Sequence, residues 1–143
     1  MTVRVERTMT VSAAPEKVWE FIVDPEQRAR PISVVQDWEV HGDGTATWHL
    51  SLPIPVISRT IQIETEDVER REPEYVRFIG RSKVMRVQGE QELTPTDDGG
   101  TAVTSRFVVD GRLPGIERFF KRNFDDELAN LEAALNEYLE LEA

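Results

Sequence analysis

The chain has 143 residues, the usual size of one domain, and its 27 acidic and 17 basic residues give a formal net charge of −10. A surface with this charge repels phosphate backbones and anionic lipid headgroups, so we expect no binding to nucleic acid and none to a membrane surface. Only three of the basic residues are lysines. Acid excess with scarce lysine favours a halophilic protein that works in molar salt, the alternative being an ordinary acidic cytosolic protein.

Two absences restrict the chemistry and the cellular location that the sequence predicts. There is no cysteine, which excludes disulfides, thiolate nucleophiles and cysteine zinc sites. The first residues lack the apolar stretch of a signal peptide, and no run approaches the roughly 20 apolar residues of a membrane span. We therefore expect a cytoplasmic protein without stable membrane insertion, and we expect no cofactor.

The N-terminal third predicts one strand and one or two short helices. The first strand alternates between apolar and polar residues, and its apolar face is formed by Val3, Val5, Met9 and Val11. Pro15 then indicates the first turn of a helix that is capped at residue 12 or 13 and ends before Pro25. A second short helix or turn is expected at residues 26–29.

The rest of the chain predicts a series of strands followed by one long helix. Six antiparallel strands are expected at residues 34–41, 45–52, 57–69, 75–81, 85–93 and 101–109. From Ile116 the apolar residues recur every three or four positions, which predicts an amphipathic helix of about 25 residues. One helix covers a wide sheet only if the sheet curves around it, and this arrangement often leaves a cavity between them. We predict a single α+β domain over residues 1–143.

Two segments resemble a known superfamily. They are VSAAPEKVWEFIVDP at residues 11–25, and GEQELTP with GTAVT at residues 89–95 and 100–104. Together with the order of the elements they resemble the START-like or SRPBCC superfamily. Within it, the polyketide cyclase/dehydrase-like and the carbon monoxide dehydrogenase subunit-like groups are the most similar. The resemblance implies a helix-grip fold of about seven strands, as in Bet v 1-like proteins, with a hydrophobic pocket between sheet and helix. It supplies no catalytic motif, because catalytic residues are not shared across the superfamily.

Polar residues on predicted inward faces are the first candidates for contact with a ligand. Arg7 shares the apolar face of the first strand, where a buried guanidinium needs a carboxylate, carbonyl groups or a ligand. The alternative is an arginine that turns out to solvent. Gln36, Arg59, Gln91 and Ser105 interrupt other apolar faces. A few polar groups in an apolar wall are typical of a ligand pocket, although internal hydrogen bonds or a bulged strand would give the same pattern.

Aromatic residues at inward positions complete the predicted pocket, either lining or filling it. The full set of pocket residues is Arg7, Gln36, Trp38, Trp48, Arg59, Phe78, Met85, Gln91, Ser105, Phe107, Phe120 and Phe124. His49 is expected to face solvent, and neither it nor His41 has the spacing of a metal site or of a catalytic triad. The acidic residues at 125–127 are expected mostly on the outer face of the last helix.

The sequence favours binding or carrying a lipid, quinone or polyketide-like molecule as the function. The first alternative is a small cyclase or dehydratase that uses Arg7 or Arg59 to polarise a carbonyl group. The lack of a recognisable inward proton carrier counts against it, so we predict no catalytic residues. The second alternative is an accessory protein of a larger enzyme complex. It needs an exposed apolar patch, which is not obvious, so a protein partner is not indicated.

Overall fold

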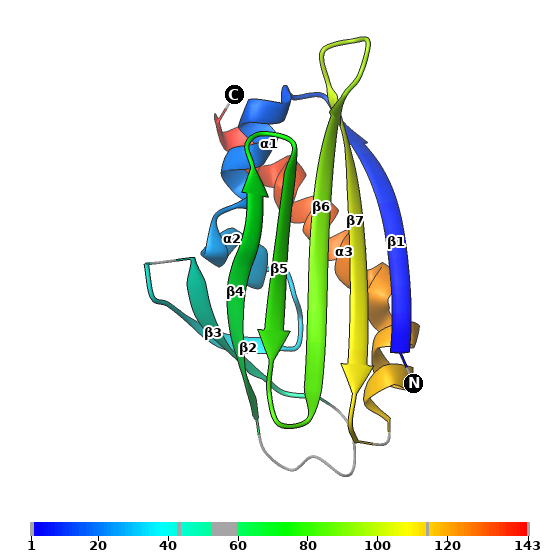
Figure 1. Ribbon diagram of the computed structural model, residues 1–143. Helices are drawn as coiled ribbons and strands as arrows, with labels where there is room; N and C mark the ends of the chain where they lie inside the picture. The colour runs from blue at the N-terminus through cyan, green and yellow to red at the C-terminus, as the bar shows by residue number, and fades with distance from the viewer. Residues whose placement is uncertain (1, 43, 53–59, 114, 143) are drawn as a thin grey trace.

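The computed structural model describes residues 2–42, 44–52, 60–113 and 115–142. A seven-stranded antiparallel sheet curves around the C-terminal helix α3 (Ile116–Glu142), which runs diagonally behind the sheet in Figure 1. This is the predicted α+β helix-grip fold. No helix in the described ranges is long and apolar enough to cross a membrane.

The sheet is continuous from one edge strand to the other. Its order is β1-β7-β6-β5-β4-β3-β2, so the two elements that follow β1 carry the chain from one edge to the opposite edge. The strands are β1 (Thr2–Val11), β2 (Val35–Val40), β3 (Thr45–Leu50), β4 (Ile61–Arg71), β5 (Tyr75–Arg81), β6 (Met85–Pro95) and β7 (Thr101–Gly111). Because β4 to β7 are joined by short turns, the wide middle of the sheet is built from local pairings.

Two short helices make this crossing and close one end of the fold. Helix α1 (Pro15–Ile22) starts at Pro15, with Ala14 at its N-cap and no side chain capping it, so the predicted cap at residue 12 or 13 lies slightly too early. Helix α2 (Pro25–Ala29) is capped by Asp24, whose carboxylate accepts a hydrogen bond of 3.0 Å from the Glu26 amide. Each helix begins with proline, which lacks the amide proton that would be unsatisfied there.

Two buried clusters divide the core. One packs the buried face of α1, including Trp19 and Phe21, against β6 and the C-terminal half of α3. The other lies between the middle of the sheet and the N-terminal half of α3, and Trp48 and Phe78 belong to it. The second cluster surrounds the cavity described below.

Two of the strands after α2 differ in detail from the expectation. Strand β2 has an irregular register between Val35 and Asp37, and the prediction that Gln36 points inward is wrong, because this irregularity leaves it exposed. Strand β4 continues to Arg71, beyond the predicted end at residue 69. Its predicted beginning at residue 57 lies outside the described residues.

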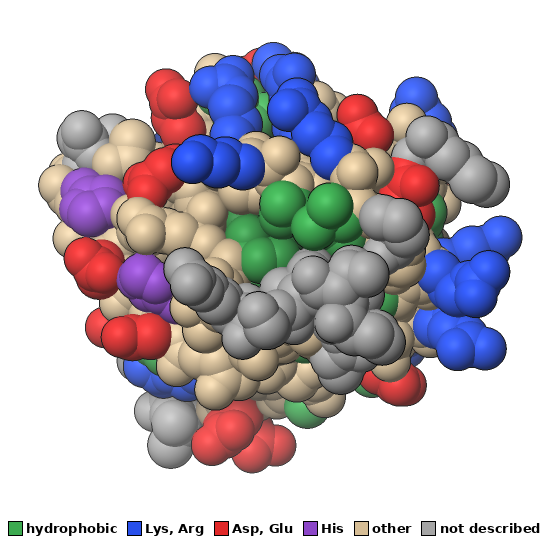
Figure 2. Space-filling model, turned by 90° about the horizontal axis from the view of Figure 1, so that it is seen from below, with side chains coloured by type: hydrophobic (Ala, Val, Ile, Leu, Met, Phe, Trp, Pro, Cys, Tyr) green, Lys and Arg blue, Asp and Glu red, His purple; other side chains and the backbone are tan. Residues whose placement is uncertain are grey.

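The charge is unevenly distributed over the surface. Figure 2 shows hydrophobic side chains at the centre of one end of the molecule, with Lys and Arg side chains on two sides of them. Cations meet at the β5–β6 turn, where Arg81 pairs across the strands with Arg86 and exposed Lys83 lies between them. Exposed Glu137 and Glu140 lie near the C-terminus of α3, whose last turn carries no basic residue. The helix dipole disfavours acids there.

This placement predicts how salt affects stability. Glu140→Gln removes a charge that the helix dipole disfavours, so it should raise the free energy of unfolding by about 0.3–1 kcal/mol at low ionic strength. In about 1 M KCl the gain should disappear, because the Debye length falls to about 3 Å. Urea unfolding at both salt concentrations measures the effect. Glu16→Gln, in the first turn of α1, is the matched control and should destabilise; a gain for Glu140→Gln that persists in salt contradicts the electrostatic explanation.

Candidate functional site

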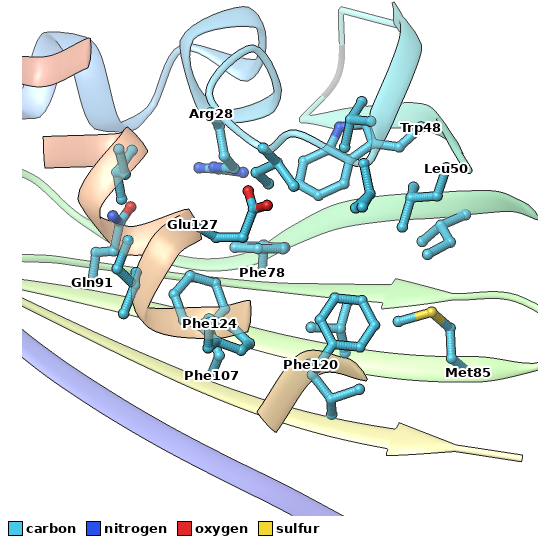
Figure 3. Close-up of a pocket in the computed structure, with 18 of the residues that line it drawn as sticks. Arg28, Trp48, Leu50, Phe78, Met85, Gln91, Phe107, Phe120, Phe124 and Glu127 are labelled. Carbon is cyan, nitrogen blue, oxygen red and sulfur yellow. The ribbon is translucent and has the colours of Figure 1, made fainter. Parts of the chain in front are cut away.

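A cavity of about 90 Å³ lies between the concave face of the sheet and α3. Its walls come from α1, α2, the segment before β2, strands β3 to β7 and the first half of α3. Figure 3 shows the side chains of these elements converging on the same space. Nearly all of the wall is apolar, so an apolar molecule would find complementary surface on every side.

Seven of the twelve residues predicted to form a pocket border this cavity. They are Trp48, Phe78, Met85, Gln91, Phe107, Phe120 and Phe124. Four of them form a chain of neighbouring rings across the space. The ring centroids of Trp48 and Phe78 lie 5.9 Å apart, and those of Phe78 and Phe107 lie 6.3 Å apart. Phe107 in turn lies 4.9 Å from Phe124 on α3. Aromatic contacts therefore join the sheet to the helix around the cavity.

Gly89 makes room for this row of rings. A Cβ atom at Gly89 would lie 2.3 Å from Cε1 of Phe78 and 2.9 Å from Cε1 of Phe107. Both distances are shorter than any real carbon–carbon contact. Glycine on β6 thus allows two aromatic rings to lie close to the sheet backbone.

Arg7 lies outside the cavity wall. It faces α3, as its strand position predicts, but its Nη1 atom donates to the backbone carbonyl of Asp125 at 3.3 Å. Of the partners that an inward arginine needs, this is the carbonyl group rather than a ligand. Arg7 therefore ties the edge strand to the helix.

The other predicted residues also lie apart from the cavity. Ser105 is fully buried behind the wall, where its hydroxyl accepts from Nε2 of Gln91 at 3.4 Å. Trp38 is half-buried and packs against the edge of the core cluster. Gln36 points to solvent, and Arg59 lies outside the described residues.

Arg28 is a polar cavity residue that the sequence analysis missed. Its side chain is only 9% exposed, and its Nη1 donates to Oδ1 of Asp67 on β4 at 2.6 Å. Its Nη2 donates to the carbonyl of Ile22 at 3.2 Å, and its Cζ lies 4.8 Å from the centre of the Phe78 ring. The buried Nε atom has no hydrogen-bond partner. No periodic pattern identifies an inward position in so short a helix as α2.

Glu127 is the second residue that the sequence analysis missed. Its carboxylate borders the cavity and accepts hydrogen bonds from the amide and the hydroxyl of Ser33, the amide bond measuring 2.8 Å. Because residues 125–127 were expected mostly on the outer face of α3, that expectation is wrong for Glu127. The signal was present, since Glu127 follows Phe124 by three positions and precedes Leu131 by four, which places all three on one helical face.

The polar and apolar residues of the cavity occupy different ends. Arg28, Gln91 and Glu127 are the polar side chains among the described residues of the wall. Gln91 lies six positions beyond Met85 on β6, roughly 20 Å along the strand. Glu127 lies seven positions beyond Phe120 on α3, about 10 Å along the helix. The end toward the β5–β6 turn is therefore apolar, and the end toward α2 carries the polar groups, as Figure 3 shows.

Both histidines lie on the outer side of the sheet. Nε2 of His41 lies 2.8 Å from Oγ1 of Thr47, which in turn donates to Glu64 at 2.8 Å. That hydrogen bond from Thr47 is the main reason that the pKa of Glu64 is lowered. Nε2 of His49 contacts Glu39 at 2.9 Å. Within the described part of the chain, no cluster of three or more His, Asp or Glu side chains is arranged to hold a metal ion.

Comparisons with known proteins agree with this geometry. The model of a family described as polyketide cyclase / dehydrase and lipid transport matches residues 2–136. A START superfamily protein from Mycobacterium smegmatis superposes with a TM-score of 0.77 at 14% identity, over 98% of this chain and 99% of the other. A conserved protein from Geobacillus kaustophilus gives 0.76 at 17% identity, over 96% of each chain. The Streptomyces aromatase/cyclase Zhui gives 0.69 at 19% identity, over 96% of this chain and 94% of the other. A search of curated proteins found no match.

The close approach at Gly89 predicts the effect of adding one methyl group there. Gly89→Ala should lower the free energy of unfolding by about 1–3 kcal/mol, because the new methyl group overlaps the Phe78 ring. Phe78→Leu removes the ring edge, so the double variant should lose less than the sum of the two single losses. Urea denaturation of the four proteins measures this coupling. Additive losses would contradict the packing described for Gly89.

Proposed function

The chain belongs to the polyketide cyclase/dehydrase and lipid transport family, and on that premise we propose that it binds and carries an apolar or amphipathic small molecule in the cavity. The observation that carries the proposal is the enclosed apolar space between the sheet and α3, with only Arg28, Gln91 and Glu127 as polar side chains on its described wall. A few polar groups in an otherwise apolar wall fix the orientation of a ligand that burial of apolar surface holds.

The size of the cavity bears on how a ligand enters. About 90 Å³ is less than the roughly 300–1,000 Å³ of pockets that enclose drug-sized ligands. A two-ring ligand therefore requires α3 or the segment before β2 to move away from the sheet. Burying about 200 Å² of apolar ligand surface contributes about 5 kcal/mol, before the entropy lost on association is subtracted. Such a gain is sufficient to open a small apolar space.

An enzyme of the cyclase or dehydratase kind is the second candidate, favoured by the carboxylate of Glu127. The sequence offered no inward proton carrier, whereas the structure has Glu127 and Arg28 on the wall of one cavity. With a β-hydroxy ketone, Glu127 would remove the α-proton and Arg28 would stabilise the enolate oxygen. The carbon–carbon double bond then forms as the hydroxyl leaves, and the proton on Glu127 passes to it to give water. The structural neighbour named aromatase/cyclase is consistent with such a reaction.

The accessory-protein alternative has less support. Among the described residues, the large hydrophobic side chains that are exposed are Val40 and Val68. They lie on β2 and β4, which are not neighbours in the sheet. These two isolated valines do not form the contiguous apolar patch expected of a docking surface.

Ligand binding is tested most simply with 2-ethylnaphthalene, an apolar two-ring compound. Titration should shift the methyl NMR signal of Met85 at the apolar end of the cavity, and calorimetry should give a one-to-one complex. Val87→Phe adds a ring inside the cavity and should weaken binding at least tenfold. Gln88→Phe, on the opposite face of the same strand, is the matched control and should bind as the wild type does. Equal binding by the two variants would place the ligand elsewhere.

The catalytic candidate is tested with 4-hydroxy-4-(2-naphthyl)butan-2-one, whose dehydration gives a conjugated enone that absorbs in the near ultraviolet. Glu127→Gln keeps an oxygen for the Ser33 hydrogen bonds but loses the base. It should therefore reduce turnover about 10²–10⁴-fold while the compound still binds. A wild-type rate no faster than that in buffer would reject this candidate and leave the binding function standing.

A further inference from the structure

We propose that Arg28 sets the ligand class of the cavity: apolar molecules that carry one uncharged oxygen acceptor, such as a ketone, ester or quinone carbonyl. Hydrocarbons of the same shape and carboxylates would bind less tightly. The inference rests on the proposed binding function and adds to it the chemistry of the group that is recognised.

The donors of Arg28 outnumber the acceptors around it. A guanidinium has five N–H protons. One is donated to Asp67 and one to the Ile22 carbonyl, and the buried Nε atom has no partner. The face of the Phe78 ring offers attraction for the charge but no lone pair for these protons. An oxygen atom of a ligand would satisfy a donor that the protein leaves unsatisfied.

The fold has another partner for the carboxylate that Arg28 contacts. Asp67 is only 6% exposed, and its Oδ2 accepts from both Nε and Nη2 of Arg70, at 2.9 and 2.6 Å. Arg70 is partly exposed and is not part of the cavity wall. Because Asp67 keeps this ion pair without Arg28, the burial of a second arginine is not required to neutralise it.

The charges around the cavity favour a neutral acceptor. Arg28 and Arg70 share the single charge of Asp67, and the charge of Glu127 on the same cavity wall balances what remains. Ser33 holds Glu127 there through two hydrogen bonds. A ligand carboxylate would add a second negative charge beside Glu127 in a poorly solvated space, where like charges repel strongly. A carbonyl oxygen accepts the same hydrogen bond without that repulsion.

The layout of the cavity also gives the ligand a direction. The carbonyl would point toward α2, and the apolar body would extend toward Met85 and Phe120, where the described wall carries no polar side chain.

Three probes of one shape test the inference on the full chain by calorimetry: 2-acetylnaphthalene, 2-ethylnaphthalene and 2-naphthoate. The ketone should bind about tenfold more tightly than the hydrocarbon, the effect of one hydrogen bond from a charged donor. The carboxylate should bind no better than the hydrocarbon. In ¹⁵N NMR, the side-chain N–H signals of Arg28 should move to higher proton frequency with the ketone, and Arg28→Met identifies these signals by removing them.

Variants separate recognition from stability. Arg28→Met should reduce the preference for ketone over hydrocarbon to about one, while Arg70→Met, which removes the other partner of Asp67, should leave the preference unchanged. Glu127→Gln should strengthen binding of 2-naphthoate alone. Equal binding of ketone and hydrocarbon by the wild type, or tightest binding of the carboxylate, overturns the inference and leaves the proposed function standing. If none of the three probes binds, the proposed function fails and the inference with it.

Discussion

One helix covers the concave face of a seven-stranded sheet, and most of the structure depends on that contact. The sheet is wider than a helix, so it has to curve, and α3 crosses it diagonally rather than along one strand. Contacts far apart in sequence hold α3 in place, from Arg7 to the Asp125 carbonyl at one edge and from Ser33 to Glu127 at the other. Between these attachments the apolar faces do not fill the space completely, and the cavity is what remains.

The polar end of that cavity follows from how the chain crosses between the two edges of the sheet. Helices α1 and α2 make this crossing, and they bring Arg28 over the sheet beside Asp67 of β4. The carboxylate holds the guanidinium, while the apolar surroundings keep water from satisfying its remaining donors. The same connection places Ser33 against Glu127 on α3. One crossover segment thus supplies or positions two of the three polar groups on the described wall of an apolar space.

Periodicity in the sequence predicts the parts of this arrangement that are regular. Alternation placed Trp48, Phe78, Met85 and Phe107 on the inner face of the sheet, and helical spacing placed Phe120 and Phe124 opposite them. It misplaced Gln36, because one irregular pairing in β2 reverses the face of a side chain. Arg28 was out of reach, since a helix of five residues has no periodic signal and its partner Asp67 lies 39 positions away. Glu127 was recoverable, because it shares a helical face with Phe124.

The central claim is that the space between the sheet and α3 holds an apolar ligand whose oxygen meets Arg28. A crystal structure with 6-bromo-2-acetylnaphthalene tests it directly, because the anomalous signal of bromine fixes one end of the ligand and the electron density of the acetyl group fixes the other. The account predicts bromine near Met85 and Phe120 and the carbonyl oxygen within hydrogen-bond distance of the Arg28 guanidinium. Bromine outside the cavity, or a carbonyl turned away from Arg28, would contradict it.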